Sequence, residues 1–370
     1  MGSAGAGLAA VRGGAKQAPA AARIEETIAA ICAVDGRWVE AARRRQLQLT
    51  KPPGSLGRLE EVANRCAGIR ESLEVTAGRP RIALFAGDHG VCAEGVSPYP
   101  QTVTAQMVSN FLQGGAAINA IAEACGIELV VVDAGVAAEL PVSSELLIRS
   151  AGAGTRNFCE EPAMTEEQMK AAMAAGIEVA GEAARAGRDV LGFGEMGIGN
   201  TTSASAIAAA LTGEPVEALV GRGTGADEGC MARKRSAVER GLARHGAELG
   251  DAQGILRCLG GFEIAAMCGF CLGAAAHRVP VAMDGFIATA AAALAVEISP
   301  RVADYLFASH CSAEPGHARL LARLGQEPLL RLEMRLGEGT GAALAIKIMQ
   351  AAIAAFTRMA TFETAGISNR

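Results

Sequence analysis

The sequence predicts an α/β fold in which helices cover a parallel β-sheet. From about residue 80 onward, six short runs of β-prone residues alternate with helical stretches. Each run leads into a turn rich in glycine or polar residues, which is typical of the carboxyl end of a buried parallel strand. Half of the 370 residues are hydrophobic, many of them alanine, and only 4% are aromatic. Since alanine favours closely packed helices, this composition indicates a helix-rich protein rather than a β-sandwich.

The N-terminal part of the chain is predicted to contain no strand. Residues 1–22 are rich in alanine and glycine, which predicts a poorly ordered extension. Residues 23–80 are predicted to be helical, because apolar side chains recur there at helical spacing, beginning with Ile24, Ile28 and Ile31.

Residues 81–335 are predicted to form the parallel α/β domain. The predicted strands are Ile82–Ala86, Ile127–Val132, Leu146–Arg149, Asp189–Phe193, Val279–Met283 and Tyr305–Ala308. Ligands of open α/β sheets bind beside the carboxyl ends of the strands. The turns that follow these strands therefore predict an active site assembled from several loops.

The C-terminal residues 336–370 are predicted to form a loop and a long helix. Apolar side chains at spacings of three or four predict this helix over residues 341–362. We expect it to return to the N-terminal helices and pack on them. Lys347 and Arg358 interrupt its apolar run, so no stretch of the chain is expected to span a membrane.

The net charge and the cysteines exclude several classes of function. The net charge of −5 argues against broad nucleic-acid binding, which needs a basic surface. The N-terminus lacks the ordered regions of a signal peptide, and we expect a cytoplasmic protein without membrane attachment. Cys268 and Cys271 form a C-x-x-C pair without the second pair that a zinc site would need. They are interpreted as small buried side chains, and no metal site is predicted.

The loop from Gly194 to Thr202 is a predicted phosphate-binding loop. Its glycines let the backbone approach an anion, and the helix that follows offers unpaired amides. The region also contains the G-x-G-x-x-G pattern of dinucleotide-binding enzymes, with Glu217 about twenty residues further on. An NAD-dependent oxidoreductase is therefore an alternative. Against it, the pattern comes late in the sheet, and Glu195 within the turn would repel a pyrophosphate.

A second loop, Arg335–Gly341, places one carboxylate, that of Glu338, among three glycines. Such a loop can bring a general base into a pocket. The same residues also fit a helix N-terminus at which Thr340 caps the helix and Glu338 interacts favourably with its dipole. Spacing alone favours neither interpretation.

Other polar residues are ambiguous by themselves. Asp88 and His89 follow a strand, but no further ligands lie nearby to complete a metal site, so a structural or substrate-orienting role is favoured. His310 and His317 lie in a polar loop, for which contact with a ligand is the simpler interpretation. Lys234, considered alone, is interpreted as a solvent-exposed residue of a helix.

Seven motifs in order along the chain resemble those of one enzyme family. They are Lys51–Gly57, Gly87–Val91, Gly194–Thr202, Gly221–Gly225, Asp284–Phe286, Ser309–His317 and Arg335–Gly341. Their order resembles that of the dimethylbenzimidazole phosphoribosyltransferases of cobalamin synthesis. The resemblance extends from about residue 24 to the C-terminus, and seven ordered motifs are far more specific than any one of them.

The resemblance implies a large Rossmann-like domain with a parallel sheet, and a small helical domain built from N- and C-terminal segments. It also implies a homodimer in which the partner subunit helps to close the base pocket. The implied reaction transfers the phosphoribosyl group of nicotinate mononucleotide to dimethylbenzimidazole, with inversion at C1′. The products are α-ribazole 5′-phosphate and nicotinate. Since the pyridinium ring of the donor leaves as a neutral ring, no cofactor, diphosphate or metal is expected.

The resemblance implies roles for individual residues. Glu338 matches the general base of the family, and Glu195 matches an acidic residue near the reacting centre. Gln106 and Met196 are expected in the base pocket. The residues expected at the nucleotide and its phosphate are Gly197, Gly199, Asn200, Lys234, Asp284, Gly285 and Ser312.

Two further alternatives stay open. The same fold could act on another base, such as adenine or a phenol, because selectivity depends on how the pocket is packed. It could also bind a nucleotide without catalysis, although the intact loop around Glu338 argues against this.

Overall fold

The computed structural model describes residues 19–223 and 225–368, so most of the predicted N-terminal extension lies outside the described residues. All six predicted strands are confirmed, and they form a single sheet in which every pairing is parallel. The strands are β1 (Arg81–Gly87), β2 (Glu128–Gly135), β3 (Leu146–Ile148), β4 (Leu191–Met196), β5 (Val281–Met283) and β6 (Leu306–Ala308).

The strand order places the loops after four strands at one edge of the sheet. The order is β3-β2-β1-β4-β5-β6, and its direction reverses between β1 and β4. In open α/β sheets this reversal leaves a crevice at the carboxyl ends of the strands, where ligands bind. Ala86 of β1 is in register with Met196 of β4, and Met283 of β5 with Ala308 of β6. The loops that follow these four strands therefore begin side by side.

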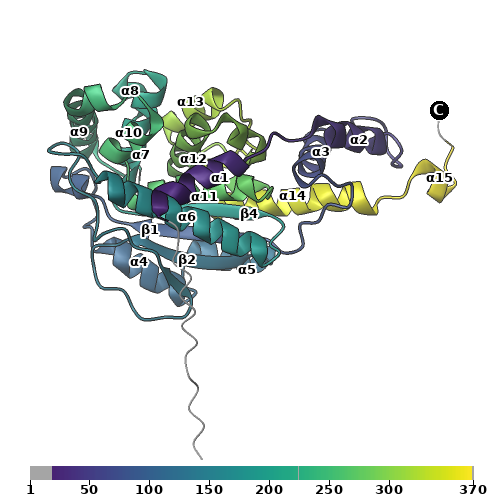
Figure 1. Ribbon diagram of the computed structural model, residues 1–370, viewed down its shortest axis with the longest axis horizontal. Coiled ribbons are helices and arrows are strands. Elements are labelled where there is room, and N and C mark those ends of the chain that lie inside the picture. The colour runs from purple at the N-terminus through teal and green to yellow at the C-terminus, as the bar shows by residue number, and fades with distance from the viewer. Residues whose placement is uncertain (1–18, 224, 369–370) are drawn as a thin grey trace, which may run out of the picture.

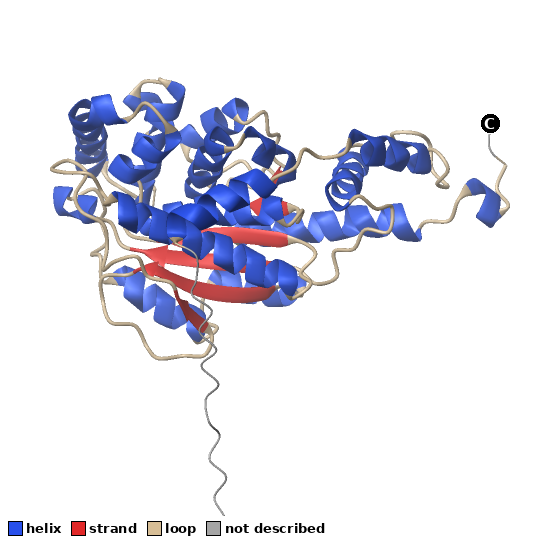
Figure 2. Cartoon of the chain, in the orientation of Figure 1, coloured by secondary structure: helices blue, strands red, loops and turns tan. Residues whose placement is uncertain are grey.

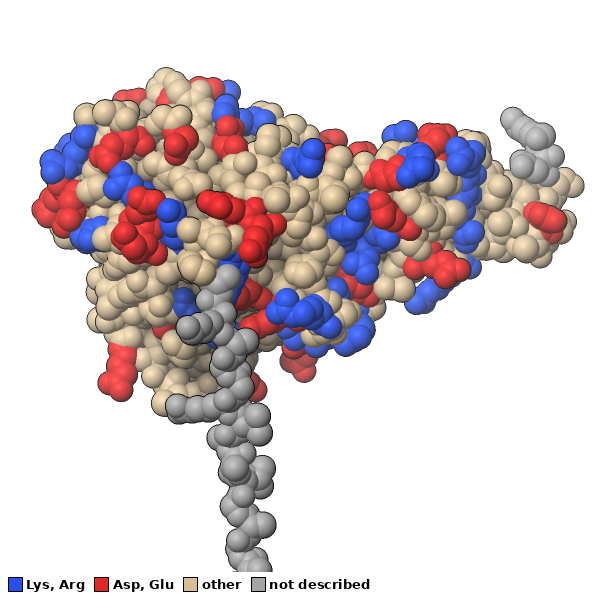
Figure 3. Space-filling view, in the orientation of Figure 1, with Lys and Arg blue, Asp and Glu red and all other residues tan. Residues whose placement is uncertain are grey.

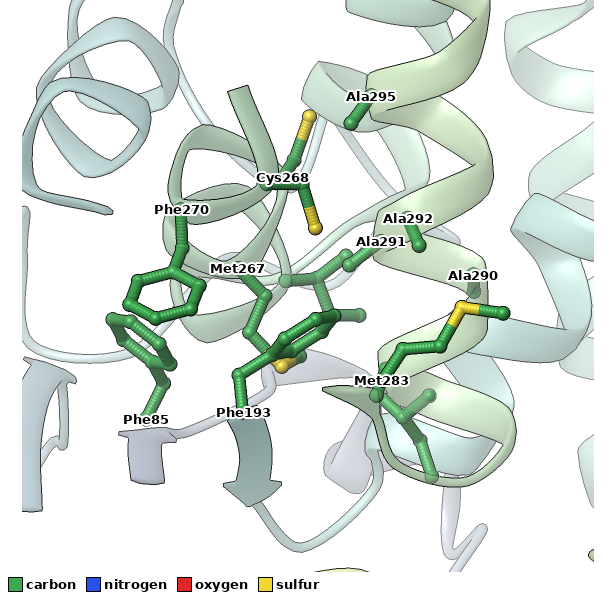
Figure 4. Close-up of a cluster of buried hydrophobic side chains, with 14 of the residues drawn as sticks. Phe85, Phe193, Met267, Cys268, Phe270, Met283, Ala290, Ala291, Ala292 and Ala295 are labelled. Atoms are coloured by element: carbon green, nitrogen blue, oxygen red, sulfur yellow. The ribbon is translucent and has the colours of Figure 1, made fainter. Parts of the chain in front are cut away.

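One face of the sheet is covered by α6 (Glu166–Arg185), α11 (Phe262–Ala276) and α12 (Phe286–Ile298), as Figures 1 and 2 show. Phe85 and Phe193 of the sheet pack on Phe270 of α11, with ring centroids 5.6 and 5.8 Å apart (Figure 4). Cys268 and Cys271 are fully buried in α11, which confirms their interpretation as small core side chains.

Glycines allow α6 and α11 to approach each other closely. A Cβ atom at Gly176 of α6 would collide with the carbonyl oxygen of Ala266, and one at Gly269 of α11 would collide with that of Met173. The two backbones are therefore nearly in contact, and no larger residue fits at either glycine without moving a helix.

The opposite face carries α4 (Val103–Leu112), α5 (Ala117–Cys125) and α14 (Thr340–Arg358). Among the described helices, α14 is long and apolar enough to cross a membrane by length and composition, which corrects the expectation that no stretch would be. It has 19 residues, and the mean hydropathy of its most apolar window is 1.4. Because 56% of that window is buried, and the helix packs on β4 and β5, α14 has the character of a core helix.

The N- and C-terminal segments meet in a helical unit beside the sheet. Helices α2 (Gly36–Gln46) and α3 (Arg58–Arg70) pack on each other, and α3 packs on α14 (Figure 1). The guanidinium of Arg45 lies 5.4 Å from the ring centre of Phe356 in α14 and donates to the carbonyl of that residue. Helix α1 (Ala20–Ala30) lies apart from this unit, on α6 and α11.

The remaining helices surround the carboxyl edge of the sheet or connect these layers. They are η1 (Gly90–Glu94), α7 (Asn200–Thr212), α8 (Val216–Leu219), α9 (Glu228–His245), η2 (Gly246–Glu248), α10 (Ala252–Leu259), η3 (Pro300–Tyr305), α13 (Pro315–Arg323) and α15 (Phe362–Ala365). Acidic and basic side chains are interspersed over the face of the molecule shown in Figure 3. The predicted α/β class with a parallel sheet is confirmed. The helical unit draws on both ends of the chain, but α1, which lies in the predicted helical segment 23–80, packs on α6 and α11 of the large domain instead.

The contact between α6 and α11 can be tested at Gly269. We expect Gly269→Ala to lower the free energy of unfolding by about 1–3 kcal/mol, because its methyl group has no space against Met173. Gly229→Ala in α9 is the matched control, since a Cβ there would have no neighbour closer than 3.5 Å. Urea unfolding would measure both variants, and equal stabilities would contradict the close contact.

Candidate active site

The N-termini of two helices, α7 and α12, open into one pocket at the carboxyl edge of the sheet. The pocket has a cavity volume of about 70 Å³ and is lined by the first residues of α7 and α12 and by Glu314, which precedes α13. The lining residues are Glu195, Met196, Gly197, Ile198, Asn200, Thr201, Gly223, Gly285, Phe286, Ile287, His310, Ser312, Glu314, Arg335, Leu336 and Gly337. Since the first amides of a helix have no partner within it and its dipole is positive there, this pocket suits an anion.

Several predicted site residues lie at this pocket. Glu195 and Met196 reach it from the end of β4, Gly197 from the loop that follows, and Asn200 from the first position of α7. Gly285 and Ser312 reach it from the loops after β5 and β6.

Gly199 and Gln106, also predicted site residues, do not line this pocket. A Cβ atom on Gly199 would lie 2.7 Å from the sulfur of Cys92, so this glycine serves close packing of the loop. Gln106 is exposed on α4, outside the pocket of this single chain.

The loop that carries Glu338 has an unusual backbone. Gly337, Glu338 and Gly339 have φ angles of 88°, 60° and 85°, all in the left-handed region. A glutamate in this region is strained, so the surrounding structure must hold it there. The amide of Glu338 donates to the carbonyl of Glu195 at 3.2 Å, and the Thr340 hydroxyl donates to the carbonyl of Gly337 at 2.8 Å.

The carboxylate of Glu338 is buried and only partly satisfied. The residue is 6% exposed, and its Oε2 atom has no hydrogen-bond partner among the described residues. Burial raises the pKa of Glu338 to about 6, the amide of Ile118 in α5 opposes this rise, and the charge of Asp284 adds to it. A buried carboxylate with a free oxygen and a pKa near neutrality suits a general base.

Helix α14 is capped by Asp284, not by Thr340. The Oδ1 atom of Asp284 accepts from the amides of Gly341 and Ala342 at 2.8 and 3.1 Å, and its Oδ2 atom accepts from Gly339 at 2.9 Å. Asp284 is 1% exposed and does not line the pocket. The interpretation of Thr340 as the cap is therefore wrong, and the predicted contact of Asp284 with substrate finds no open oxygen.

Glu195 lies at the end of β4, between the two loops. One of its carboxylate oxygens accepts a hydrogen bond from the side-chain amide of Asn200. Burial, with the charges of Glu263 and Asp284, raises the pKa of Glu195 to about 8. Glu195 is therefore largely neutral at pH 7, so the repulsion of a pyrophosphate expected from the sequence is weak.

Lys234 is buried, which contradicts the interpretation of its motif as solvent-exposed. The residue is 1% exposed, and its Nζ atom donates to Thr201 Oγ1 at 3.0 Å and to the Gly221 carbonyl at 2.9 Å. Because Thr201 lines the pocket, this ammonium group lies directly behind the wall formed by α7. Burial lowers the pKa of Lys234, and the carboxylate of Glu314 opposes that change.

His89 connects the loop after β1 to helices α11 and α7. Its Nε2 atom lies 2.6 Å from Glu263 Oε1, and its Nδ1 atom lies 3.0 Å from the Ser203 hydroxyl. Both ring nitrogens are thus engaged by neighbouring residues, which favours the structural role of the two that the sequence left open, structural or substrate-orienting.

His317 and His310 support the loop after β6. His317 accepts from the amide of Ser312 at 2.8 Å and contacts the Thr289 hydroxyl at 2.9 Å. Burial lowers the pKa of His317 to about 3 and that of His310 to about 4, so both rings are neutral. His310 lines the pocket. His317 does not line it, but its hydrogen bond holds the backbone of Ser312, which does.

A possible metal-binding group in the described part of the chain lies away from this pocket. It consists of His245, Glu248 and Cys258, on α9, η2 and α10. Glu248 forms an ion pair with Arg257, and His245 Nε2 donates to the carbonyl of Phe158 at 2.8 Å.

Sequence reasoning named the loops of the site but missed some of its contributors. Arg335 lines the pocket and donates to the carbonyl of Gly223 at 2.9 Å, although no role was predicted for it. The first residues of α12, Phe286 and Ile287, were also missed. The polar turn after β5, followed by an apolar helix, is the signal that could have indicated them.

Comparisons with known proteins identify relatives of the chain. A family model described as phosphoribosyltransferase matches residues 31–367. The nicotinate-nucleotide–dimethylbenzimidazole phosphoribosyltransferase of Chloroflexus aggregans is 49% identical over 347 residues, which cover 94% of this chain and 98% of the relative. The protein of the same name from Geobacter sulfurreducens is 48% identical over 345 residues, covering 93% and 98% of the two chains.

Solved structures extend the similarity to the fold. The crystal structure of CobT from Thermus thermophilus superposes with a TM-score of 0.87 at 48% sequence identity. The match covers 90% of this chain and 100% of that chain. The chain therefore belongs to the nicotinate-nucleotide–dimethylbenzimidazole phosphoribosyltransferase family.

Proposed function

We propose that this protein is a pentosyltransferase that moves the phosphoribosyl group of nicotinate mononucleotide to dimethylbenzimidazole. The products are α-ribazole 5′-phosphate and nicotinate. The names of relatives that match nearly over their full length support these substrates. The observation that carries the proposal is the buried carboxylate of Glu338, which has an oxygen without a hydrogen-bond partner among the described residues. Glu338 does not itself line the pocket, but it directly follows Arg335, Leu336 and Gly337, which do.

The pocket accounts for binding of the donor. The phosphate of nicotinate mononucleotide lies against the helix N-termini, near Gly197, Asn200, Gly285 and Ser312. Lys234 adds a positive charge behind α7, although it does not itself line the pocket. This set of amides and one buried ammonium group binds the phosphate without a metal ion.

The acceptor base approaches from the side of α4 and α5. Met196 lines the pocket, and Gln106 is exposed on α4, where it is available to a second subunit or to the base. The carboxylate of Glu338 lies toward the first turn of α5, because the amide of Ile118 acts on it. We therefore place the base between α4 and the Glu338 loop, with the partner subunit of a homodimer closing this side.

The chemistry requires one proton acceptor. One azole nitrogen of dimethylbenzimidazole attacks C1′, and the bond from C1′ to the pyridinium nitrogen breaks with its electron pair going to nicotinate. The other azole nitrogen loses its proton to Glu338 as the new bond forms. Attack opposite the leaving group converts the β-linkage to an α-linkage. Glu195, in its neutral form, holds Asn200 and, through its carbonyl, the backbone of Glu338.

Replacement of Glu338 tests the assigned base. We expect Glu338→Gln to lower kcat about 10²–10⁴-fold, the usual contribution of a positioned general base. Glu333→Gln is the matched control, because Glu333 also has a positive φ angle but is exposed. Chromatography of α-ribazole phosphate, formed without added metal, measures both variants.

Other results of this assay would contradict parts of the proposal. Full activity of the Glu338 variant would exclude it as the base. Activity with adenine or phenol but not with dimethylbenzimidazole would keep the reaction class and change the acceptor. A wild-type protein that binds nicotinate mononucleotide yet uses no acceptor would be a non-catalytic binding protein.

The acidic groups of the site predict a bell-shaped dependence of kcat on pH. Because the base must be ionised, kcat is lost as the pH falls through about 6 and Glu338 takes up a proton. As the pH rises through about 8, Glu195 ionises and adds a negative charge beside the phosphate, so kcat falls again. Glu195→Gln should remove the alkaline limb and keep the acid limb. An alkaline limb that persists in this variant would exclude Glu195 as its origin.

A further inference from the structure

We propose that Asp284 is a positioning residue for the reaction, which holds Glu338 in place through the first turn of α14 and does not contact substrate. This inference rests on the proposed function, because it requires Glu338 to be the base. The hydrogen bonds of Asp284, its burial and the packing around α14 carry it.

Glu338 is fixed from both sides along the backbone. Its own amide donates to the carbonyl of Glu195 at the end of β4. The peptide that follows Glu338 ends in the amide of Gly339, which donates to Asp284 Oδ2 at the end of β5. The strained glutamate is therefore held between two neighbouring strands, and the side chain of Asp284 provides one of the two supports.

Both oxygens of Asp284 are needed for this support. Oδ2 holds Gly339, next to the base, and Oδ1 holds Gly341 and Ala342, which fixes the start of α14. An asparagine has only one acceptor oxygen, so its amide nitrogen would face a backbone N–H group. Asp284→Asn therefore loses either the hydrogen bonds that cap α14 or the hydrogen bond to the amide of Gly339.

Asp284 is buried where the start of α14 packs closely on the sheet. A Cβ atom at Gly341 would collide with His310 Nδ1 and would lie 2.8 Å from Asp284 Oδ1. A Cβ atom at Gly194 of β4 would collide with the backbone of Gly339. The start of α14 is thus pressed directly on the strand ends, and Asp284 lies behind the loop rather than in the pocket.

The charge of Asp284 distinguishes a positioning role from a purely stabilising one, because this charge affects the pKa of Glu338. The titratable groups that face it are His310, whose Nδ1 atom is 3.9 Å from Oδ1, and the carboxyl groups of Glu195 and Glu338. His310 is neutral because burial lowers its pKa to about 4. Burial raises the pKa of Asp284 itself to about 6, so Asp284 and Glu338 take up protons over the same pH range. Burial is the largest cause of the raised pKa of Glu338, and the negative charge of ionised Asp284 adds to it. Removal of this charge therefore lowers the pKa of the base.

The experiment compares Asp284→Asn with Asp133→Asn. Asp133 is the matched control, since it is also buried near a strand end and accepts from the amides of Gly135 and Val136, but on β2. We expect Asp284→Asn to lower kcat about 10²-fold, the effect of a small misplacement of a catalytic group. Its KM for nicotinate mononucleotide should stay close to that of the wild type, and the acid limb of kcat should move to lower pH. Asp133→Asn should leave kcat and this limb unchanged.

Asp284→Ser keeps the inference testable if the asparagine variant does not fold. Serine supplies one acceptor for the amides of α14, as serine does at helix N-caps, but lacks the charge and the second oxygen. Circular dichroism and thermal unfolding identify a folded variant. The serine variant should show the same loss of kcat and the same displacement of the acid limb.

Two outcomes would overturn the inference. An increased KM for nicotinate mononucleotide with preserved kcat would make Asp284 a substrate ligand. A loss of kcat with an unmoved acid limb, shared by Asp133→Asn, would make it a structural residue only. The proposed function fails in a different way, since it is lost if the wild type makes no α-ribazole phosphate or if Glu338→Gln keeps its kcat.

Discussion

The attachment of α14 to the ends of β4 and β5 is the constraint on which the site depends. Asp284 accepts three amides at the start of this helix, and glycines at 194 and 341 remove the side chains that would keep the helix away. The helix is otherwise a core element, packed on the sheet along much of its length. A strongly bound start of α14 leaves the preceding loop little freedom, so Glu338 can be held in a left-handed conformation that it would not adopt alone.

Buried acidic groups beside an anion-binding pocket need an electrostatic explanation, and the helices provide it. The N-termini of α7 and α12 face the pocket, and a third, that of α14, is neutralised by Asp284. Positive helix ends stabilise a nearby phosphate, and Lys234 adds its charge from behind. Among the acids, burial and mutual repulsion keep Glu195 largely protonated near neutrality, whereas Glu338 stays mostly ionised. Two nearby carboxyl groups thereby obtain different protonation states from different surroundings.

Much of the fold could be predicted because its signals are local. A short β-prone run followed by a polar turn is visible in the sequence, and all six predicted strands are present in one parallel sheet. The position of Lys234 could not be predicted in this way, since a basic helix segment has the same pattern whether it faces solvent or a buried loop. The cap of α14 was assigned to Thr340 for the same reason, because Asp284 lies more than fifty residues away in the chain.

The α/β class, the six strands, the loops that carry the site and the resemblance to a phosphoribosyltransferase family can be inferred from the sequence alone, because each depends on neighbouring residues or on ordered motifs. Which of these polar groups meet depends on the tertiary structure. It placed Asp284 under α14 rather than in the pocket, buried Lys234 behind α7 and brought Arg335 to the lining. The physical reason is that hydrogen-bond partners and burial are set by contacts between strand ends that are far apart in the chain. Periodicity and composition describe neighbouring residues only, so they do not reveal those contacts.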